Sequence, residues 1–142
     1  MEYFIKPKSR FMFPHLKNGK LVTAFTPETK LQLISADDIG RFAQAAFTNP
    51  QKFHGLSIDL AAEALTMSEI ANQMNATLGT AISAEFLSYT EAVASGLAPG
   101  WVQTQQWVNV TGGYKADIDV AHSIGVELIR FHYWLNEHKN SF

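Results

Sequence analysis

The residues most suggestive of chemistry are the adjacent carboxylates Asp37 and Asp38. Two carboxylates can share a proton or bind a metal ion when they converge, but adjacent residues at a helix start point in different directions. A carboxylate at that place accepts hydrogen bonds from the free N–H groups of the first turn and suits the positive end of the helix dipole. We therefore predict that both are structural helix caps, and we predict no catalytic residue.

A second acidic group combines Asp117 and Asp119 with His122. Asp119 and His122 are three positions apart, so a helix would place them on one side, where they could bind a metal ion. A helix cap with a surface histidine is the alternative that we favour. The sequence has no cysteine, which excludes disulfides, thiolate zinc sites and cysteine nucleophiles, and its five histidines show no ligand spacing. We predict no metal site.

The common cofactor and nucleophile motifs are also absent from the sequence. Gly112-Gly113 is the only glycine pair, and no glycine-rich dinucleotide loop or phosphate-binding loop follows a predicted strand. No tyrosine is followed four residues later by a lysine, and there is no Gly-x-Ser-x-Gly elbow. The residues alone thus indicate an α/β domain without a recognisable catalytic group.

Composition limits the remaining function classes. The chain of 142 residues is expected to form a single domain, residues 1–142, with 46% hydrophobic residues and a net charge of −2. The basic residues are scattered, so we expect no nucleic-acid partner. No run of apolar residues is long enough for a membrane span, and the first residues lack the apolar core of a signal peptide. We expect no membrane contact and a cytoplasmic location.

Periodicity and turn signals predict the elements that would position these residues. A helix entered at Asp37 or Asp38 should bury one face, formed by Ile39, Phe42, Ala43, Ala46 and Phe47. Thr66 with Glu69 forms a capping box for a helix that ends before Gly79. Strands are predicted at residues 20–25, 31–34, 55–60 and 81–87. Further helices are predicted at residues 90–96, 99–111 and 126–138, with a short one between Asp117 or Asp119 and Gly125.

Several segments in order resemble the NmrA-like family, atypical members of the short-chain dehydrogenase superfamily that bind NAD(P). The resemblance is carried by Gly-Lys-Leu-Val-Thr-Ala-Phe (19–25), Leu-Ile-Ser-Ala-Asp-Asp-Ile-Gly (33–40), Gly-Leu-Ser-Ile-Asp-Leu-Ala (55–61) and Leu-Thr-Met-Ser-Glu-Ile-Ala (65–71). The opening Met-Glu-Tyr-Phe and the Trp134-Leu135 pair of the tail agree with it. The resemblance covers the C-terminal half of the family fold only, so the chain is expected to be a partial domain, the substrate lobe without the dinucleotide-binding half.

That resemblance implies a parent protein that reduces a small carbonyl or quinone-like compound with NAD(P)H, or a redox sensor coupled to a regulatory partner. Its substrate lobe would supply the pocket candidates Tyr3, Phe4, Ile34, Ser35 and Trp101. This chain alone is expected to be inactive and to bind NAD(P) without high affinity. It is also expected to self-associate or to bind the missing nucleotide-binding half. The alternative is a stand-alone α+β domain that binds a protein or a small molecule.

Overall fold

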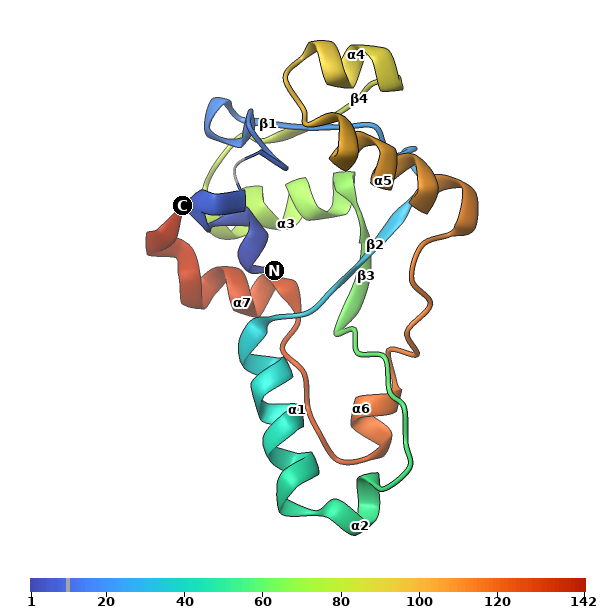
Figure 1. The fold of residues 1–142 in the computed structure, drawn as a ribbon. Helices are drawn as coiled ribbons and strands as arrows, with labels where there is room; N and C mark the ends of the chain where they lie inside the picture. Colours follow the sequence, from blue (N-terminus) through green and yellow to red (C-terminus); the bar gives the residue numbers. More distant parts are fainter. Residues whose placement is uncertain (10) are drawn as a thin grey trace.

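Short strands and helices alternate along the chain in the computed structural model, which describes residues 1–9 and 11–142 (Figure 1). The strands are β1 (Lys20–Thr23), β2 (Lys30–Leu33), β3 (Glu63–Thr66) and β4 (Ser83–Phe86). The helices are α1 (Ala36–Thr48), α2 (Pro50–Phe53), α3 (Met67–Leu78), α4 (Tyr89–Ala94), α5 (Pro99–Thr111), α6 (Val120–Ser123) and α7 (Phe131–His138). Single 3₁₀ turns are formed by Glu2–Phe4, Pro7–Ser9, Leu16–Asn18 and Lys139–Ser141. The predicted α/β class is confirmed.

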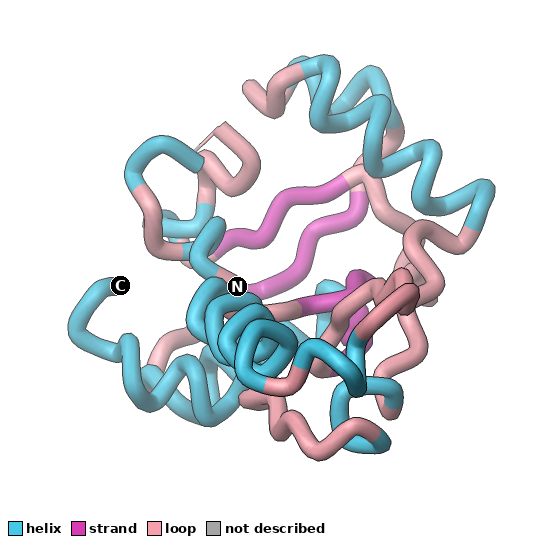
Figure 2. The backbone as a smooth tube through the Cα atoms, turned by 60° about the horizontal axis from the view of Figure 1, so that its bottom comes forward, coloured by secondary structure: helices cyan, strands magenta, loops and turns pink. Residues whose placement is uncertain are grey.

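The strands pair across long stretches of sequence. β1 runs parallel to β4, with Leu21 opposite Ala84, and β2 runs antiparallel to β3, with Leu31 opposite Leu65. Figure 2 shows both pairs at the centre of the molecule, with helices around them. A parallel pair needs a crossover connection, and here that connection contains β2, α1 and α3. The sheets of the described part therefore hold together segments that are far apart in the chain.

The main core lies where α3 and α7 pack against the strands. α3 buries Met67, Ile70, Ala71 and Met74, which is the face that the sequence predicts, and Gly79 ends the helix with a left-handed φ of 68°. α7 adds Phe131, Trp134 and Leu135, all at most 1% exposed. Figure 1 shows α3 and α7 together beside the N-terminal turns. These two helices fix the body of the molecule.

The helix caps differ in one respect from the prediction. Thr66 and Glu69 form the reciprocal hydrogen bonds of the predicted capping box on α3. On α1, however, the N-cap is Ser35, whose hydroxyl accepts a hydrogen bond of 3.1 Å from the Asp38 N–H. The prediction that Asp37 or Asp38 caps this helix is therefore wrong, because the helix begins one residue earlier and places both carboxylates inside its first turn.

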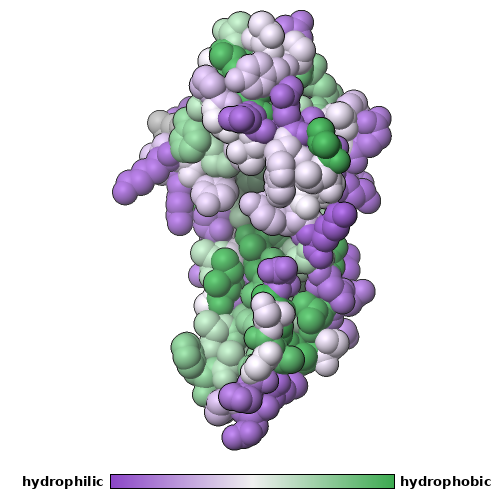
Figure 3. Space-filling model, turned by 45° about the vertical axis from the view of Figure 1, so that its right-hand side comes forward, coloured by the Kyte–Doolittle hydropathy of each residue, from purple (hydrophilic) through white to green (hydrophobic). Residues whose placement is uncertain are grey.

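Residues 36–60, which we call the projecting arm, extend from the body of the molecule and contain α1 and α2 (Figure 1). The predicted buried face of α1 is wrong: Ile39 is 51% exposed and Phe47 is 85% exposed. Asp38 is the arm's only fully buried residue, and no arm residue belongs to a core cluster. Figure 3 shows apolar surface gathered on this lower part of the molecule. The amphipathic pattern of α1 is therefore real, but among the described elements α2 covers only part of it, where the ring of Phe53 meets that of Phe42 edge-on at 5.5 Å.

Two further predictions fail near the arm. Residues 55–60 form no strand, because among the described residues none pairs with this segment. The last helix begins at Phe131 rather than at residue 126, and two carboxylates from elsewhere in the chain accept hydrogen bonds from N–H groups at its start. Asp38 accepts a 3.0 Å hydrogen bond from the Ile129 N–H, and Glu63 accepts one from the Phe131 N–H. The negative charge of Glu63 thus lies at the start of α7, where the helix dipole favours it.

Candidate functional site

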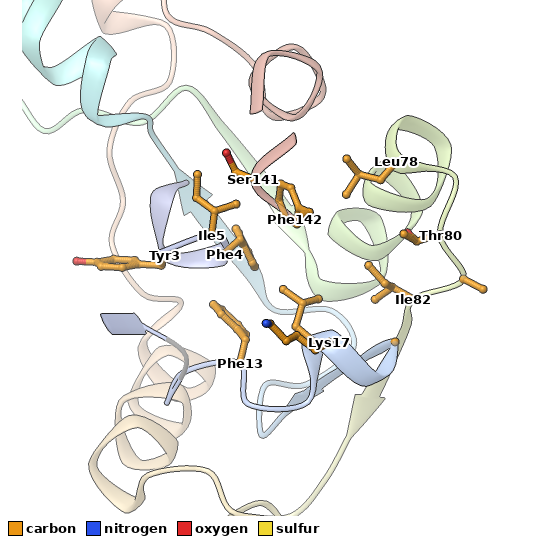
Figure 4. A pocket seen from close by; sticks show the side chains of 13 residues that line it. Tyr3, Phe4, Ile5, Phe13, Lys17, Leu78, Thr80, Ile82, Ser141 and Phe142 are labelled. Carbon is orange, nitrogen blue, oxygen red and sulfur yellow. The ribbon is translucent and has the colours of Figure 1, made fainter. Parts of the chain in front are cut away.

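A cavity of about 520 Å³ opens between the N-terminal turns, the end of α3 and the C-terminal residues. Its walls are mostly apolar, and Figure 4 shows the side chains arranged around the space. The lining residues are Tyr3, Phe4, Ile5, Phe13, Leu16, Lys17, Gly19, Leu78, Thr80, Ala81, Ile82, Ser141 and Phe142. The cavity is the best-formed candidate for a binding site in the described part of the chain.

Stacked aromatic rings form the wall of this cavity. The ring centroids of Phe4 and Phe13 lie 4.7 Å apart with 21° between their planes, and both side chains are almost fully buried. Behind them, Trp101 meets Phe13 edge-on at 6.2 Å and donates a 3.1 Å hydrogen bond from its indole N–H to the Met12 carbonyl. Stacked and edge-on contacts of this kind stabilise aromatic pairs beyond their burial. The two rings thus support each other, and the small part of each that stays exposed gives this side of the cavity an aromatic surface.

The opposite wall is held by a side-chain amide. The Asn75 amide accepts a 2.6 Å hydrogen bond from the Ile82 N–H and donates one of 2.8 Å to the Ile82 carbonyl. The Asn75 side chain thus makes the two hydrogen bonds that a neighbouring strand would otherwise make with the Ile82 backbone. Ile82 is thereby fixed with its side chain against the cavity, at the entry to β4 (Figure 4).

A partly buried polar network anchors the N-terminal turn that carries Phe4. The Glu2 carboxylate accepts hydrogen bonds from the Ala36 N–H at 3.0 Å and from the Trp134 indole N–H at 3.2 Å. Partial burial alone would raise the pKa of Glu2, but the contacts led by the Ala36 hydrogen bond lower it below its ordinary value of 4.5. Glu2 therefore stays ionised and ties this turn to the starts of α1 and α7.

Two of the five residues proposed from the sequence line this cavity. Phe4 forms part of the aromatic wall, whereas Tyr3 lines the edge, is 61% exposed and points away from the space (Figure 4). The other three lie elsewhere: Ser35 caps α1, the Ile34 carbonyl accepts a hydrogen bond from the Met1 nitrogen, and Trp101 supports Phe13 from behind. Contact of any of the five with a ligand stays a prediction.

Sequence reasoning missed Phe13, Leu78 and Ile82 as cavity residues. Their separate segments carry no motif, and only the pairing of β1 with β4 brings residues 13–19 next to residues 78–82. Asn75 was the available signal, because an amide in the last turn of a helix that ends at a glycine can hold the following loop. The cavity is thus a product of tertiary pairing rather than of a local pattern.

The acidic groups considered for metal binding do not converge. In residues 1–9 and 11–142, no three His, Asp or Glu side chains lie together in a way that could hold a metal ion. His122 contacts Glu127 at 2.5 Å, and the Asp117 carboxylate accepts a 3.0 Å hydrogen bond from the Asp119 N–H. No helix in the described part is long and apolar enough to cross a membrane.

Comparison with known protein families identifies the chain's family. The model of the NmrA-like family matches residues 3–134, which is most of the chain. No curated protein matches the sequence. The family match spans the aromatic wall, the projecting arm, α3 and the first half of α7. The chain therefore belongs to the NmrA-like family, whose members are associated with NAD(P).

Proposed function

We propose that this chain is the substrate-binding lobe of an NAD(P)-dependent NmrA-like protein, either a reductase of small carbonyl or quinone-like compounds or a redox sensor. The observation that carries the proposal is the cavity beside Phe4 and Phe13. Its volume of about 520 Å³ falls in the range of roughly 300–1,000 Å³ that small-molecule sites occupy. Its aromatic wall suits a flat, mostly apolar molecule.

The cofactor would be held by a separate nucleotide-binding half. A dinucleotide pyrophosphate is bound by backbone N–H groups of a glycine-rich loop at a helix N-terminus, and the 142 residues contain no such loop. We therefore expect this polypeptide alone to show no tight NADPH binding and no turnover. A calorimetric titration that found micromolar affinity for NADPH would overturn this part of the proposal.

Ligand binding can be tested with menadione, a flat quinone, by following the quenching of tryptophan fluorescence. The variant Ala81→Trp places a large side chain on the cavity rim, and we expect it to weaken binding at least about tenfold, since the ring would occupy ligand space. Ala76→Trp is the matched control, because Ala76 is also exposed but lies outside the cavity. Equal binding by both variants would exclude the cavity as the site.

The second candidate function is docking of the nucleotide-binding half on the projecting arm. The observation in its favour is the segment 55–60, in which apolar and polar residues alternate as in a half-buried strand. No described residue makes a hydrogen bond with the backbone of residues 57–60. Leu56, Ile39 and Phe47, which belong to the same arm, are also exposed. An open parallel sheet edge with apolar cover would satisfy both the backbone and the side chains.

Light scattering across a concentration series can test this docking, with and without the nucleotide-binding half of an NmrA-like protein. We expect a one-to-one complex that Ile39→Ser with Phe47→Ser weakens. Val110→Ser should leave it unchanged, because Val110 is 87% exposed on α5, away from the arm. A homodimer that the arm variants abolish would assign the surface to a second copy instead. A strictly monomeric chain that forms no complex would refute the docking.

A further inference from the structure

Lys17 is the single charged side chain among the described residues that line the cavity. It lies on the turn Leu16–Asn18, where the Gly19 N–H donates a 3.0 Å hydrogen bond to the Leu16 carbonyl and Gly19 has a φ of 74°. In Figure 4 its amino group points toward the ring of Phe13, so the charge stands beside the aromatic wall. The backbone of this turn is fixed, which fixes the place from which the ammonium reaches the cavity.

No described carboxylate lies within salt-bridge distance of Lys17. Lys20 differs from it in this respect, because its ammonium lies 2.9 Å from the Glu85 carboxylate. Lys52 likewise donates a 2.7 Å hydrogen bond to the Ile124 carbonyl. The cavity therefore combines a buried apolar wall with a cation that forms no salt bridge within the described part of the chain. Lys17 is exposed, so its ammonium is accessible to an anionic group that enters the cavity from solvent.

The aromatic wall and the Lys17 ammonium together favour a ligand that has both a flat ring and an anionic group. The wall formed by Phe4 and Phe13 favours a flat ring that stacks or meets the rings edge-on. The ammonium of Lys17 favours an anionic group at the edge of that ring, because charge-assisted hydrogen bonds are the stronger ones. A small inorganic anion would leave the wall empty, and a neutral aromatic compound would leave the ammonium unpaired. A planar aromatic molecule with one carboxylate fits both.

We propose that the cavity binds a planar aromatic carboxylate, with its ring against Phe4 and Phe13 and its carboxylate at the amino group of Lys17. This inference rests on the proposed function and names the ligand class of the same site. A carbonyl substrate of the intact protein would then be an aromatic compound that also carries an acidic group. Thr80 and Ser141 line the same cavity and add hydroxyl groups near its rim.

The test compares 2-naphthoate with its neutral analogue 2-naphthamide by calorimetric titration of the full chain. We expect wild-type protein to prefer the carboxylate about tenfold or more, and Lys17→Gln to abolish that preference while binding the amide unchanged. Lys17→Arg should keep the preference. Lys115→Gln is the matched control, because it removes one exposed lysine charge outside the cavity and should change neither affinity.

The outcomes separate this inference from the proposed function. Equal affinity of the wild type for both compounds, or a preference that survives in Lys17→Gln, would refute the role of Lys17 but leave the cavity as a ligand site. Failure of both compounds and of menadione to bind would refute the cavity as a site altogether. Because Lys17 is exposed, the glutamine variant is expected to fold, and its unfolding midpoint verifies this independently.

Discussion

The side-chain carbonyl of Gln105 accepts a 2.6 Å hydrogen bond from the backbone N–H of Ala24. The same oxygen accepts a 3.1 Å hydrogen bond from the Thr23 hydroxyl, and Gln105 and Thr23 are completely buried. One turn further along α5, Asn109 donates a 2.8 Å hydrogen bond to the Ala24 carbonyl. Two amides from one helix thus hold the end of β1, and through β1 they hold its partner β4 beside the cavity.

Replacing Gln105 by alanine should lower the free energy of unfolding by about 2–4 kcal/mol, because two buried donors lose their acceptor and a cavity remains. Gln103→Ala should change it by less than about 0.5 kcal/mol, since Gln103 is exposed on the same helix. Urea denaturation of both variants measures the difference. A Gln105→Ala protein as stable as the control would show that α5 does not hold β1.

Asp38 is the second buried polar residue whose removal should be costly. Its carboxylate accepts the 3.0 Å hydrogen bond from Ile129, and its other oxygen lies 2.8 Å from the half-exposed Arg41 guanidinium. Asp38→Ala should cost about 2–3 kcal/mol, and Asp38→Asn should cost less, because the amide oxygen still accepts from Ile129. Asp37→Ala is the control, with an expected loss below about 1 kcal/mol. Thermal unfolding of the three variants would contradict this if Asp37 proved the costlier position.

Sequence patterns predicted elements whose signals are local. The capping box of Thr66 and Glu69, Pro99 at a helix start and Gly112 at its end place α3 and α5 at the bounds that the structure has. Residues 55–60 and α1 show the opposite case. The alternation in residues 55–60 and the amphipathic spacing in α1 indicate which side chains would be buried if another element packed against them. Such patterns do not indicate whether that element is present.

The pH dependence of stability should depend partly on the two capping glutamates. The pKa of Glu69 is lowered by hydrogen bonds from the Thr66 N–H and hydroxyl, and the pKa of Glu91 by those from the Ser88 hydroxyl and N–H. Both folded-state pKa values lie below the ordinary value of 4.5. The stabilisation that the two ionised carboxylates give to the folded state is therefore fully present above that pH. It is lost as the pH falls through the lower folded values.

We therefore expect the free energy of unfolding to decrease less steeply below pH 4.5 in the double variant Glu69→Gln with Glu91→Gln than in the wild type. The free energy of unfolding of the double variant should still fall somewhat with pH because of Glu2, whose pKa is also lowered. Glu137→Gln serves as the control, because Glu137 is exposed on α7 and is not part of a capping box. Identical pH profiles of the double variant and the wild type would exclude the capping carboxylates as a cause of acid sensitivity.

The candidate site was less predictable than the helices because its residues are brought together by pairing rather than by spacing. Phe4 was recognised through the family resemblance, whereas Phe13 and Ile82 come together only because β1 lies beside β4. Trp101 was expected at the pocket and instead supports Phe13 from the side away from the space. Sequence spacing reports which residues share a face of one element, and it does not report which loops a parallel strand pair brings together.

Two glycine-to-alanine changes should act in opposite directions. Gly113 has a φ of 67°, and a Cβ there would lie 3.0 Å from the Val108 Cγ1 atom, so Gly113→Ala should cost at least about 1–2 kcal/mol. Gly40 lies inside α1 with nothing within 4 Å of an added Cβ, so Gly40→Ala should stabilise by about 0.5–1 kcal/mol. Urea midpoints of the two variants measure both effects. A gain at Gly40 would show that the exposed helix α1 unfolds with the body, whereas no change there would show that the projecting arm unfolds separately.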